Sequence, residues 1–308
     1  MIADSTISFV VQGPVIKEGE NTTKEVLNSI RKNFPNSEII LSTWKNEAVD
    51  GLECDQVVFS DLPDSLNLYT GHQCNINRQI VSTLNGIHAA SNKYLVKTRT
   101  NTLFTGNEIL ALYRNKQASV FKQFVYTIDL FSRDQYKSSV KSFHDGFLHH
   151  PSDIFLLGLK EDIEQLFSCE MATKALMLNK GGLGILAPEQ YLWMNLLIRK
   201  QQIKDYKNSL VKYNPEACYK SEKLLFENFR VYHFETLGVR LENRLINGWM
   251  ADTVITEAYQ KEIDALSASE REKKYAARAA YYCLINNHFW RKVKKSYRRK
   301  VNKYLKFN

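Results

Sequence analysis

Two polar segments of the chain each follow an apolar run, and their side chains could bind a diphosphate. Gln12-Gly13-Pro14 follows the run Ile7–Val11, and Lys97–Thr102 (KTRTNT) closes the run that begins at Lys93. A diphosphate requires cations and hydrogen-bond donors, and the second segment supplies two cations, an amide and three hydroxyl groups. A solvated strand end with incidental polarity is the alternative. The candidate ligands in the two segments are Gln12, Gly13, Pro14, Lys97, Arg99, Asn101 and Thr102.

A third cluster, Asn77-Arg78-Gln79, lies near the start of the amphipathic segment Asn75–Ala90. The apolar residues of this segment fall on one helical face, and Arg78 lies one position off that face. A helix N-terminus and a guanidinium group together favour an anion, so Asn77, Arg78 and Gln79 join the candidate ligands. A surface arginine without a ligand is the alternative for Arg78.

The elements that position these residues follow from the apolar patterning. The β-type runs of the first hundred residues are Ile7–Val11, Glu38–Trp44, Gln56–Ser60 and Lys93–Lys97. They alternate with helical patterns, which predicts an α/β fold with a largely parallel sheet and crossover helices. Ligands of such sheets bind outside the carboxyl ends of the strands. Thr43 and Trp44, the last residues of the second run, therefore join the candidates.

The rest of the chain is predicted to continue this pattern less regularly. The expected later strands are Phe121–Ser132, Asp153–Gly158 and Phe229–Phe234. The expected later helices are Lys160–Phe167, a helix from Pro188 through Arg199, and everything from about Thr253 onward. We find no internal repeat and no linker long enough to require a domain boundary.

The composition narrows the class of protein. A chain of 308 residues with 44% hydrophobic and 24% charged residues is typical of a globular protein. No apolar run reaches the ~18 residues of a membrane span, and the N-terminal MIADSTISFVVQGPV reads as a strand instead of a secretory signal. The five cysteines are widely spaced, which disfavours a disulfide framework or zinc site and favours a reducing cytoplasm.

The positive charge of the chain is concentrated at its C-terminus. The net charge is +9, and 12 of the 42 Lys and Arg residues follow Glu272, whereas no acidic residue does. Within Ala279–Asn308, aromatic and aliphatic residues recur at helical spacing among the basic ones. This pattern is typical of a helix in the headgroup region of an anionic membrane. Nucleic acid is the competing partner, and a solvated helix is the third alternative.

Several of these segments occur together, in the same order, in one known family. The sequence resembles the WavE-type lipopolysaccharide synthesis family of glycosyltransferases over roughly residues 7 to 195. The combination is more specific than any single motif. The matching blocks are SFVVQGPV, SIRKNFPNSEIILSTW, NINRQIVSTLNGI, YLVKTRTNT, HPSDIFLLG with the following KEDI, and APEQYLW.

The resemblance implies a GT-A-like, Rossmann-type glycosyltransferase domain over residues 1–252, with helices flanking the sheet. Its nucleotide-sugar half would span about 1–105 and its acceptor half about 106–252, followed by a helical C-terminal region at 253–308. The implied reaction moves a sugar from a nucleotide-sugar donor to lipopolysaccharide core, O-antigen or capsule. A lipid-linked or lipid A-linked acceptor would place the enzyme at the inner face of the cytoplasmic membrane, docked through its basic tail.

One position departs from the family's pattern. Where the family has Arg-Ser/Thr-Asp-Thr, this chain has Arg99-Thr100-Asn101-Thr102. The family aspartate would hold a metal ion, and an amide is a poor ligand for a hard divalent cation. Either another acid holds Mn²⁺ or Mg²⁺, or the metal is dispensable and Lys97, Arg99 and Arg78 neutralise the diphosphate. We favour the second possibility.

The family blocks also contain two carboxylates, Asp153 in HPSDIFLLG and Glu189 after Pro188. An inverting transferase needs one carboxylate that accepts the proton of the acceptor hydroxyl. We assign this role to Asp153, and we assign binding of the donor or acceptor sugar to Glu189. The alternatives are a turn or cap for Asp153 and a first-turn acid that stabilises the helix dipole for Glu189.

A second class of function stays open. Asn101 could mark a degenerate donor site in a non-catalytic nucleotide- or nucleic-acid-binding protein, whose footprint would be the basic tail. Hydrolysis of a nucleotide sugar by the purified protein would separate the two readings. We expect the transferase, with a glycan acceptor and no nucleic-acid partner.

Overall fold

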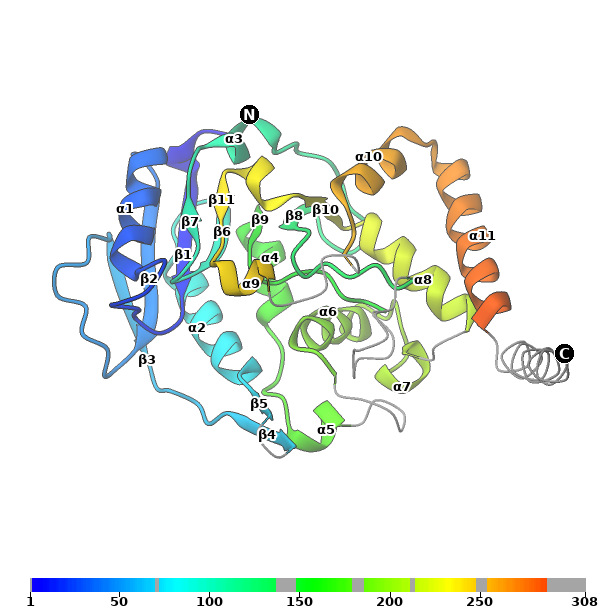
Figure 1. Ribbon diagram of the computed structural model, residues 1–308, viewed down its shortest axis with the longest axis horizontal. Helices are drawn as coiled ribbons and strands as arrows, with labels where there is room; N and C mark the ends of the chain where they lie inside the picture. Colours follow the sequence, from blue (N-terminus) through cyan, green and yellow to red (C-terminus); the bar gives the residue numbers. More distant parts are fainter. Residues whose placement is uncertain are drawn as a thin grey trace, which may run out of the picture.

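A seven-stranded sheet with the strand order β10-β8-β9-β6-β1-β2-β3 forms the centre of the computed structural model. The structure describes residues 2–69, 72–136, 148–178, 186–210, 214–247 and 254–286. Helices cover both faces of the sheet (Figure 1). The predicted α/β class with a mostly parallel sheet flanked by helices is therefore confirmed.

The early strands of the chain form the parallel part of the sheet. β1 (Ile7–Gln12) lies between β2 (Glu38–Trp44) and β6 (Tyr94–Arg99), and β3 (Gln56–Ser60) pairs with β2. Every residue of β1 is buried, as is typical of a strand covered on both faces. Parallel pairing brings the carboxyl ends of these strands to one edge, where the polar segments of the sequence begin.

The later strands continue the sheet with one reversal. β9 (Leu156–Leu159) runs antiparallel to β6 and to β8 (Val125–Ile128), and β10 (Phe229–Tyr232) is parallel to β8. The strand therefore begins at Leu156, whereas the sequence predicted that it begins at Asp153. Because β9 is reversed, its start lies at the edge where β6 ends. Asp153 thus reaches the carboxyl edge of the parallel strands.

Each face of the sheet has its own helices and its own hydrophobic core. α2 (Ile76–Ala89), α4 (Lys160–Phe167) and α6 (Pro188–Arg199) contribute to one core, and α1 (Thr23–Asn33) and α3 (Glu108–Leu112) contribute to the other.

Two local features fix the two early helices. A capping box between Thr22 and Glu25 fixes the start of α1. On the opposite face, a Cβ atom at Gly86 would lie 2.5 Å from Val10 Cγ1, so a glycine is needed for α2 to pack this closely on β1.

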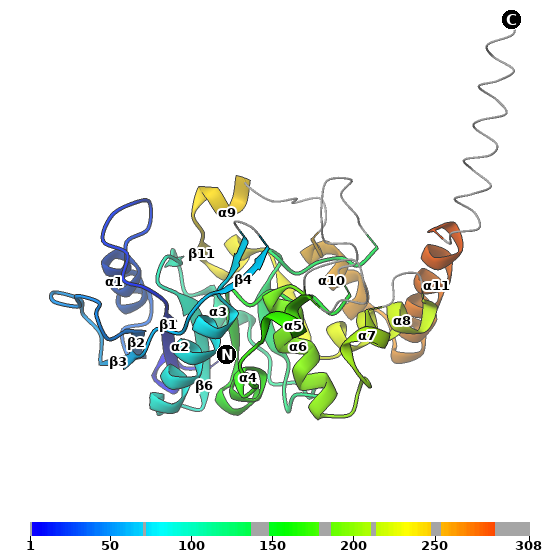
Figure 2. The same ribbon diagram turned by 90° about the horizontal axis from the view of Figure 1, so that it is seen from below.

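A short strand pair brings a late segment next to an early one. β7 (Leu103–Phe104) pairs antiparallel with β11 (Val239–Arg240), and α9 (Asn243–Asn247) follows directly. Asn243 then binds Glu20, with its amide nitrogens 2.6 and 2.8 Å from the carboxylate oxygens. Figure 2 shows α9 and β4 rising on the same side of the molecule. The remaining short elements are β4 (Leu66–Tyr69), β5 (His72–Cys74), α5 (Lys174–Leu178), α7 (Tyr206–Ser209) and the 3-10 turns Asp4–Thr6 and Phe234–Leu237.

Three helices form the C-terminal part: α8 (Pro215–Phe226), α10 (Glu257–Ala265) and α11 (Ala268–Asn286). The last two agree with the helical region predicted from about Thr253, and residues 287–308 of the predicted basic tail lie outside the described residues. Among the helices of the described ranges, none combines the length and the apolar character that a membrane crossing requires.

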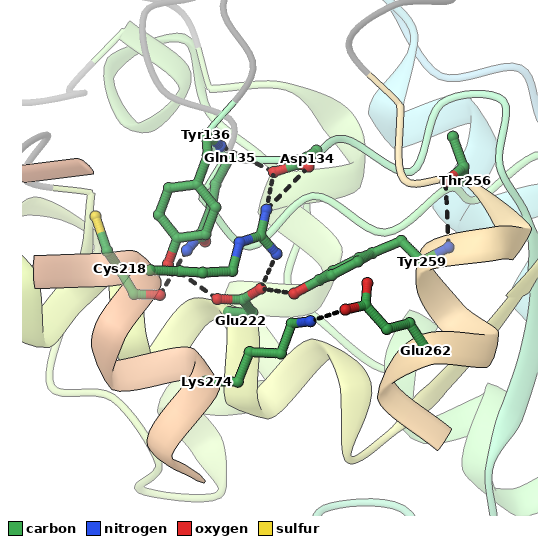
Figure 3. Close-up of polar contacts among 10 residues, drawn as sticks. Asp134, Gln135, Tyr136, Cys218, Glu222, Thr256, Tyr259, Glu262 and Lys274 are labelled. Atoms are coloured by element: carbon green, nitrogen blue, oxygen red, sulfur yellow. Dashed lines mark hydrogen bonds and ion pairs between the residues drawn. The ribbon is translucent and has the colours of Figure 1, made fainter. Parts of the chain in front are cut away.

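An ion cluster fastens α11 to the body of the protein (Figure 3). The Arg278 guanidinium group contacts the carboxylates of Asp134 and Glu222, at 3.3 Å for Asp134. It also lies between the rings of Tyr136 and Tyr259, 4.5 and 4.3 Å from their centroids. Both tyrosine hydroxyls donate to Glu222, at 3.0 and 2.6 Å. The two buried carboxylates and the guanidinium group therefore satisfy one another.

Candidate functional site

A cavity of about 500 Å³ lies at the carboxyl ends of the parallel strands. Its wall consists of residues that end or follow the strands β1, β2, β3 and β6, the segment before β9, the starts of α2 and α6, and one residue of α9. This volume is within the range of cavities that bind nucleotide-sized ligands.

The cavity collects most of the residues that the sequence singled out. The lining includes Gln12, Gly13, Pro14, Trp44, Arg78, Gln79, Arg99, Asn101, Asp153 and Glu189. The other four, Thr43, Asn77, Lys97 and Thr102, are buried and do not belong to this lining. Asn77 exchanges two hydrogen bonds with the backbone of Ala172, at 3.0 and 2.7 Å, so its side chain ties the start of α2 to a neighbouring loop.

The order of the strands gives the cavity a long axis. Adjacent strands lie about 4.8 Å apart, so the edge from the end of β2 to the start of β9 is about 14 Å long. Trp44 lies at one end of this path and Asp153 at the other, with Arg99 between them at the end of β6. Different chemistry therefore lines the two ends and the middle.

The end at β2 and β3 is mostly apolar. Trp44 closes β2, and Leu62 follows β3 with 52% of its surface exposed. Glu47 adds a carboxylate to the cavity wall. It lies in the turn after β2, where its backbone N–H donates to the Trp44 carbonyl at 3.0 Å.

The middle of the cavity carries a close backbone turn. Gly13 has φ = +128°, and a Cβ atom there would lie 3.1 Å from the Thr100 hydroxyl oxygen. Thr100 N–H donates to the Gln12 carbonyl at 3.2 Å, which holds the turns after β1 and β6 together. Only glycine adopts this conformation without strain, and it leaves the cavity floor free of a side chain.

Arginines from three separate elements reach the cavity. Arg99 ends β6, and Arg78 belongs to the first turn of α2, where its Nε donates to the Pro63 carbonyl at 2.9 Å. Arg244 comes from α9, which Asn243 holds against the loop before α1. The guanidinium groups supply the charge and the forked donors that a diphosphate needs.

The opposite end of the cavity contains two carboxylates. Asp153 is buried, and Gln79 Nε2 donates to its Oδ2 atom. The Lys97 ammonium group donates to the Asp153 backbone carbonyl. Both the carboxylate and the main chain of Asp153 are therefore held by neighbouring side chains.

Glu189 is the second carboxylate and lies in the first turn of α6, directly after Pro188. Its side chain is 15% exposed, and its Oε2 atom lies 3.9 Å from His150 Nε2. Burial and the neighbouring Asp153 carboxylate raise the pKa of Glu189 to about 8, against the opposing effect of Arg133 and Arg99. This shift favours the protonated form of Glu189, which can donate a hydrogen bond.

Asn101, the residue that departs from the family pattern, also lines the cavity. It is buried, and its backbone carbonyl accepts a hydrogen bond from Asn21 Nδ2 at 3.0 Å. Within the described ranges, no group of three or more His, Cys, Asp or Glu residues is arranged to hold a metal ion. Position 101 therefore carries an amide, which is a poor ligand for a hard divalent cation, where the family pattern has an acid.

A comparison with known families identifies the family of this chain. Residues 7–298 match the family described as WavE lipopolysaccharide synthesis. The chain belongs to this family. A search of curated proteins gives no match. Family membership confirms the resemblance noted in the sequence and supports a role in lipopolysaccharide synthesis.

Some lining residues were absent from the candidates of the sequence, notably Glu47, Leu62 and Arg244. Glu47 and Leu62 follow strands that the sequence located. The rule that ligands bind outside the carboxyl ends of parallel strands could therefore have identified them. Arg244 had no such signal, because the long-range pairing of β11 with β7 brings it to the cavity.

Proposed function

We propose that this protein is a glycosyltransferase that moves a sugar from a nucleotide-sugar donor onto a bacterial surface glycan. One observation carries the proposal: a single cavity has an apolar end, arginines in its lining and a pair of carboxylates at the other end. A nucleotide sugar has the same sequence of chemistry, from base through diphosphate to sugar. Membership of a lipopolysaccharide synthesis family supports the same conclusion.

The donor would bind with its base near Trp44 and Leu62 and its sugar near Asp153 and Glu189. The diphosphate would then lie beside Arg99 and the open backbone of Gly13. An extended nucleotide sugar is compatible with a path of about 14 Å between the two ends. The arginines would stabilise the charge that develops on the leaving diphosphate as the glycosidic bond breaks.

Asp153 is proposed as the general base. It would accept the proton of the acceptor hydroxyl while that oxygen forms a bond to the anomeric carbon and the bond to the diphosphate breaks. Gln79 and Lys97 keep Asp153 in place from the side-chain and main-chain sides. Neutral Glu189 would donate a hydrogen bond to a sugar hydroxyl without repelling Asp153.

We derive no step through a metal ion, because Asn101 places an amide where the family pattern has a carboxylate. Arg78, Arg99 and Arg244 can together neutralise a diphosphate. The proposed reaction therefore depends on guanidinium groups for leaving-group stabilisation.

The acceptor is proposed to be lipid-linked or lipid A-linked, with the enzyme docked at the inner face of the cytoplasmic membrane. Tyr281 and Leu284, one helical turn apart on α11, are 66% and 58% exposed. The sequence beyond them is basic and contains no acid. Exposed apolar side chains followed by Lys and Arg match the chemistry of an anionic lipid surface.

Co-sedimentation with vesicles tests the docking. The full chain should bind vesicles that contain anionic lipid and should be released as salt rises, because each basic residue near the surface contributes about 1 kcal/mol. A chain truncated after Asn286 should bind markedly less. Tight binding of oligonucleotides at physiological salt, without vesicle binding, would instead support the nucleic-acid alternative.

Titration with nucleoside diphosphates tests the donor site. Arg99→Ala should weaken binding by about 1.5–3 kcal/mol, the range for a hydrogen bond to a charged group. Arg31→Ala is the matched control, because Arg31 forms a partly exposed ion pair with Asp55 at 2.7 Å and does not line the cavity. Equal affinity of both variants and the unmodified chain for the nucleoside diphosphate would show that Arg99 is not part of the donor site.

A further inference from the structure

α8 and α11 pack against each other as an antiparallel pair with successive cross-contacts. The Phe226 ring stacks on Tyr275 with centroids 6.2 Å apart, and Glu222 binds Arg278 one turn further along α8. One more turn along α8 lies Cys218, which contacts Cys283. The cysteine contact is thus the described cross-contact nearest to the start of the basic tail.

The two sulfur atoms of Cys218 and Cys283 lie 3.9 Å apart, and no disulfide joins them. Both side chains are buried, in a small apolar cluster with Leu148, Ala217 and Ala279. A disulfide requires sulfur atoms about 2.05 Å apart, so the pair needs to approach by about 2 Å. Two of the neighbouring side chains, those of Ala217 and Ala279, are small.

We propose that Cys218 and Cys283 form a reversible disulfide that locks α11 onto α8. Cys218 and Cys283 contact each other across the packed helices α8 and α11. This arrangement distinguishes them from Cys54, Cys74 and Cys169. The bond would close a loop that runs from α8 through α10 to α11. The helix from which the basic tail continues would then be held covalently as well as by Arg278.

The oxidant is a small-molecule disulfide such as oxidised glutathione. One cysteine thiolate attacks a glutathione sulfur, forms a mixed disulfide and releases one reduced glutathione. The thiolate of the second cysteine then attacks the protein sulfur of that mixed disulfide, forms the Cys218–Cys283 bond and releases the second reduced glutathione. The protein loses two protons and two electrons, and the glutathione disulfide gains them.

Burial sets the conditions of this reaction. Because the thiols are buried, they can react with glutathione disulfide when the last turns of α11 open. Burial also raises the pKa of the Cys283 thiol, which lowers the fraction of reactive thiolate. The reduced form therefore persists in a reducing compartment, and an oxidising shift closes the lock. Closure in turn suppresses the local opening that allowed it.

Mass spectrometry of the full chain in a glutathione redox buffer tests the proposal. The oxidised protein should lose two hydrogen atoms and give one cross-linked peptide that contains Cys218 and Cys283, with the other cysteines reduced. Amide hydrogen exchange in the described part of α11 should become slower than in the reduced protein. Cys169→Ser should behave like the unmodified chain, whereas Cys283→Ser should give neither the cross-link nor slower exchange.

Three results would overturn the proposal. One is the absence of the Cys218–Cys283 peptide from the oxidised, unmodified chain. Another is a stable mixed disulfide with glutathione that does not proceed to the internal bond. The third is a cross-link that leaves exchange in α11 unchanged, since the disulfide would then form without locking the helix.

Discussion

The side-chain ammonium group of Lys97 donates a hydrogen bond to the backbone carbonyl of Asp153. Lys97 is fully buried, 5.6 Å from the centre of the Phe167 ring, and burial lowers its pKa to about 8. The sequence suggested Lys97 as a diphosphate ligand because it closes a strand beside Arg99. Its position within the core supports a role in holding Asp153 at the end of the cavity.

Lys97→Met should therefore reduce turnover far more than nucleotide affinity. Methionine is of similar length and apolar, so it should fit the buried position, but it leaves the Asp153 carbonyl without its donor. Displacement of a reacting group by about 1 Å can cost about 10²-fold in rate, so we expect kcat to fall about 10- to 100-fold. The dissociation constant of a nucleoside diphosphate should stay nearly constant. Parallel loss of affinity and turnover would return Lys97 to the diphosphate site.

The pH dependence of turnover should reveal Glu189. Because its pKa is raised to about 8, Glu189 donates a hydrogen bond at neutral pH and loses that ability as the pH rises further. Turnover should fall on the alkaline side, and Glu189→Gln should abolish this fall because an amide stays neutral. An alkaline fall that persists in Glu189→Gln and disappears in Lys97→Met would assign it to Lys97 instead.

Stability gives an independent check of the same pKa. The raised pKa means that the folded protein retains a proton that the unfolded chain has lost, between about 4.5 and 8. The contribution of this proton to the free energy of unfolding is fully present below the pKa of Glu189 in the unfolded chain and is lost as the pH rises through its pKa in the folded protein. The loss is at most about 1.4 kcal/mol per pH unit. Denaturant unfolding of Glu189→Gln should show a smaller decline over this range. Identical pH profiles for the two proteins would place the pKa of Glu189 near its ordinary value.

Transfer activity should persist in excess EDTA. The reason is the donor set of the described cavity, where Arg78, Arg99 and Arg244 line the wall and an amide stands at Asn101. The assay compares initial rates with EDTA and after addition of manganese. A rate that EDTA abolishes and manganese restores would show that another acid holds a metal.

Arg278→Met should destabilise the C-terminal helices. The substitution leaves Asp134 and Glu222 buried without their cation, and removal of one partner from a buried ion pair costs about 3–5 kcal/mol. Lys261→Met is the control, because Lys261 is mostly exposed and pairs with Glu257 on the surface of α10. Hydrogen exchange in α11 should accelerate in the first variant alone. Equal stability of the two variants would mean that the cluster shown in Figure 3 contributes little.

The sequence predicted the strands of the site well because each has a dense local signal. Glu38–Trp44 and Gln56–Ser60 occur in the structure with the predicted bounds. Lys160–Phe167 and Pro188–Arg199 do so as helices. β-branched runs, a proline at a first turn and apolar spacing are properties of neighbouring residues, so a single sequence reveals them.

Non-local features of the site could not be predicted in this way. The reversal of β9 depends on which strands it joins, and α9 reaches the cavity through pairing between residues more than a hundred positions apart. The burial of Lys97 is similar, because a lysine at a strand end looks exposed until a second element covers it. The sequence predicted Asn77 as an anion ligand, whereas its side chain exchanges hydrogen bonds with the backbone of Ala172, a loop partner that sequence patterns do not identify.

The most direct test of the account is release of nucleoside diphosphate from a panel of common nucleotide sugars by the purified full chain, compared with Asp153→Asn. Even without an acceptor, water can slowly replace the acceptor hydroxyl, so at least one nucleotide sugar should be cleaved. Loss of the general base should lower that rate by about 10²-fold or more. We expect cleavage by the unmodified chain and almost none by Asp153→Asn, which should still bind the donor. Failure of the unmodified chain to bind or cleave any nucleotide sugar, or equal cleavage by both proteins, would contradict it.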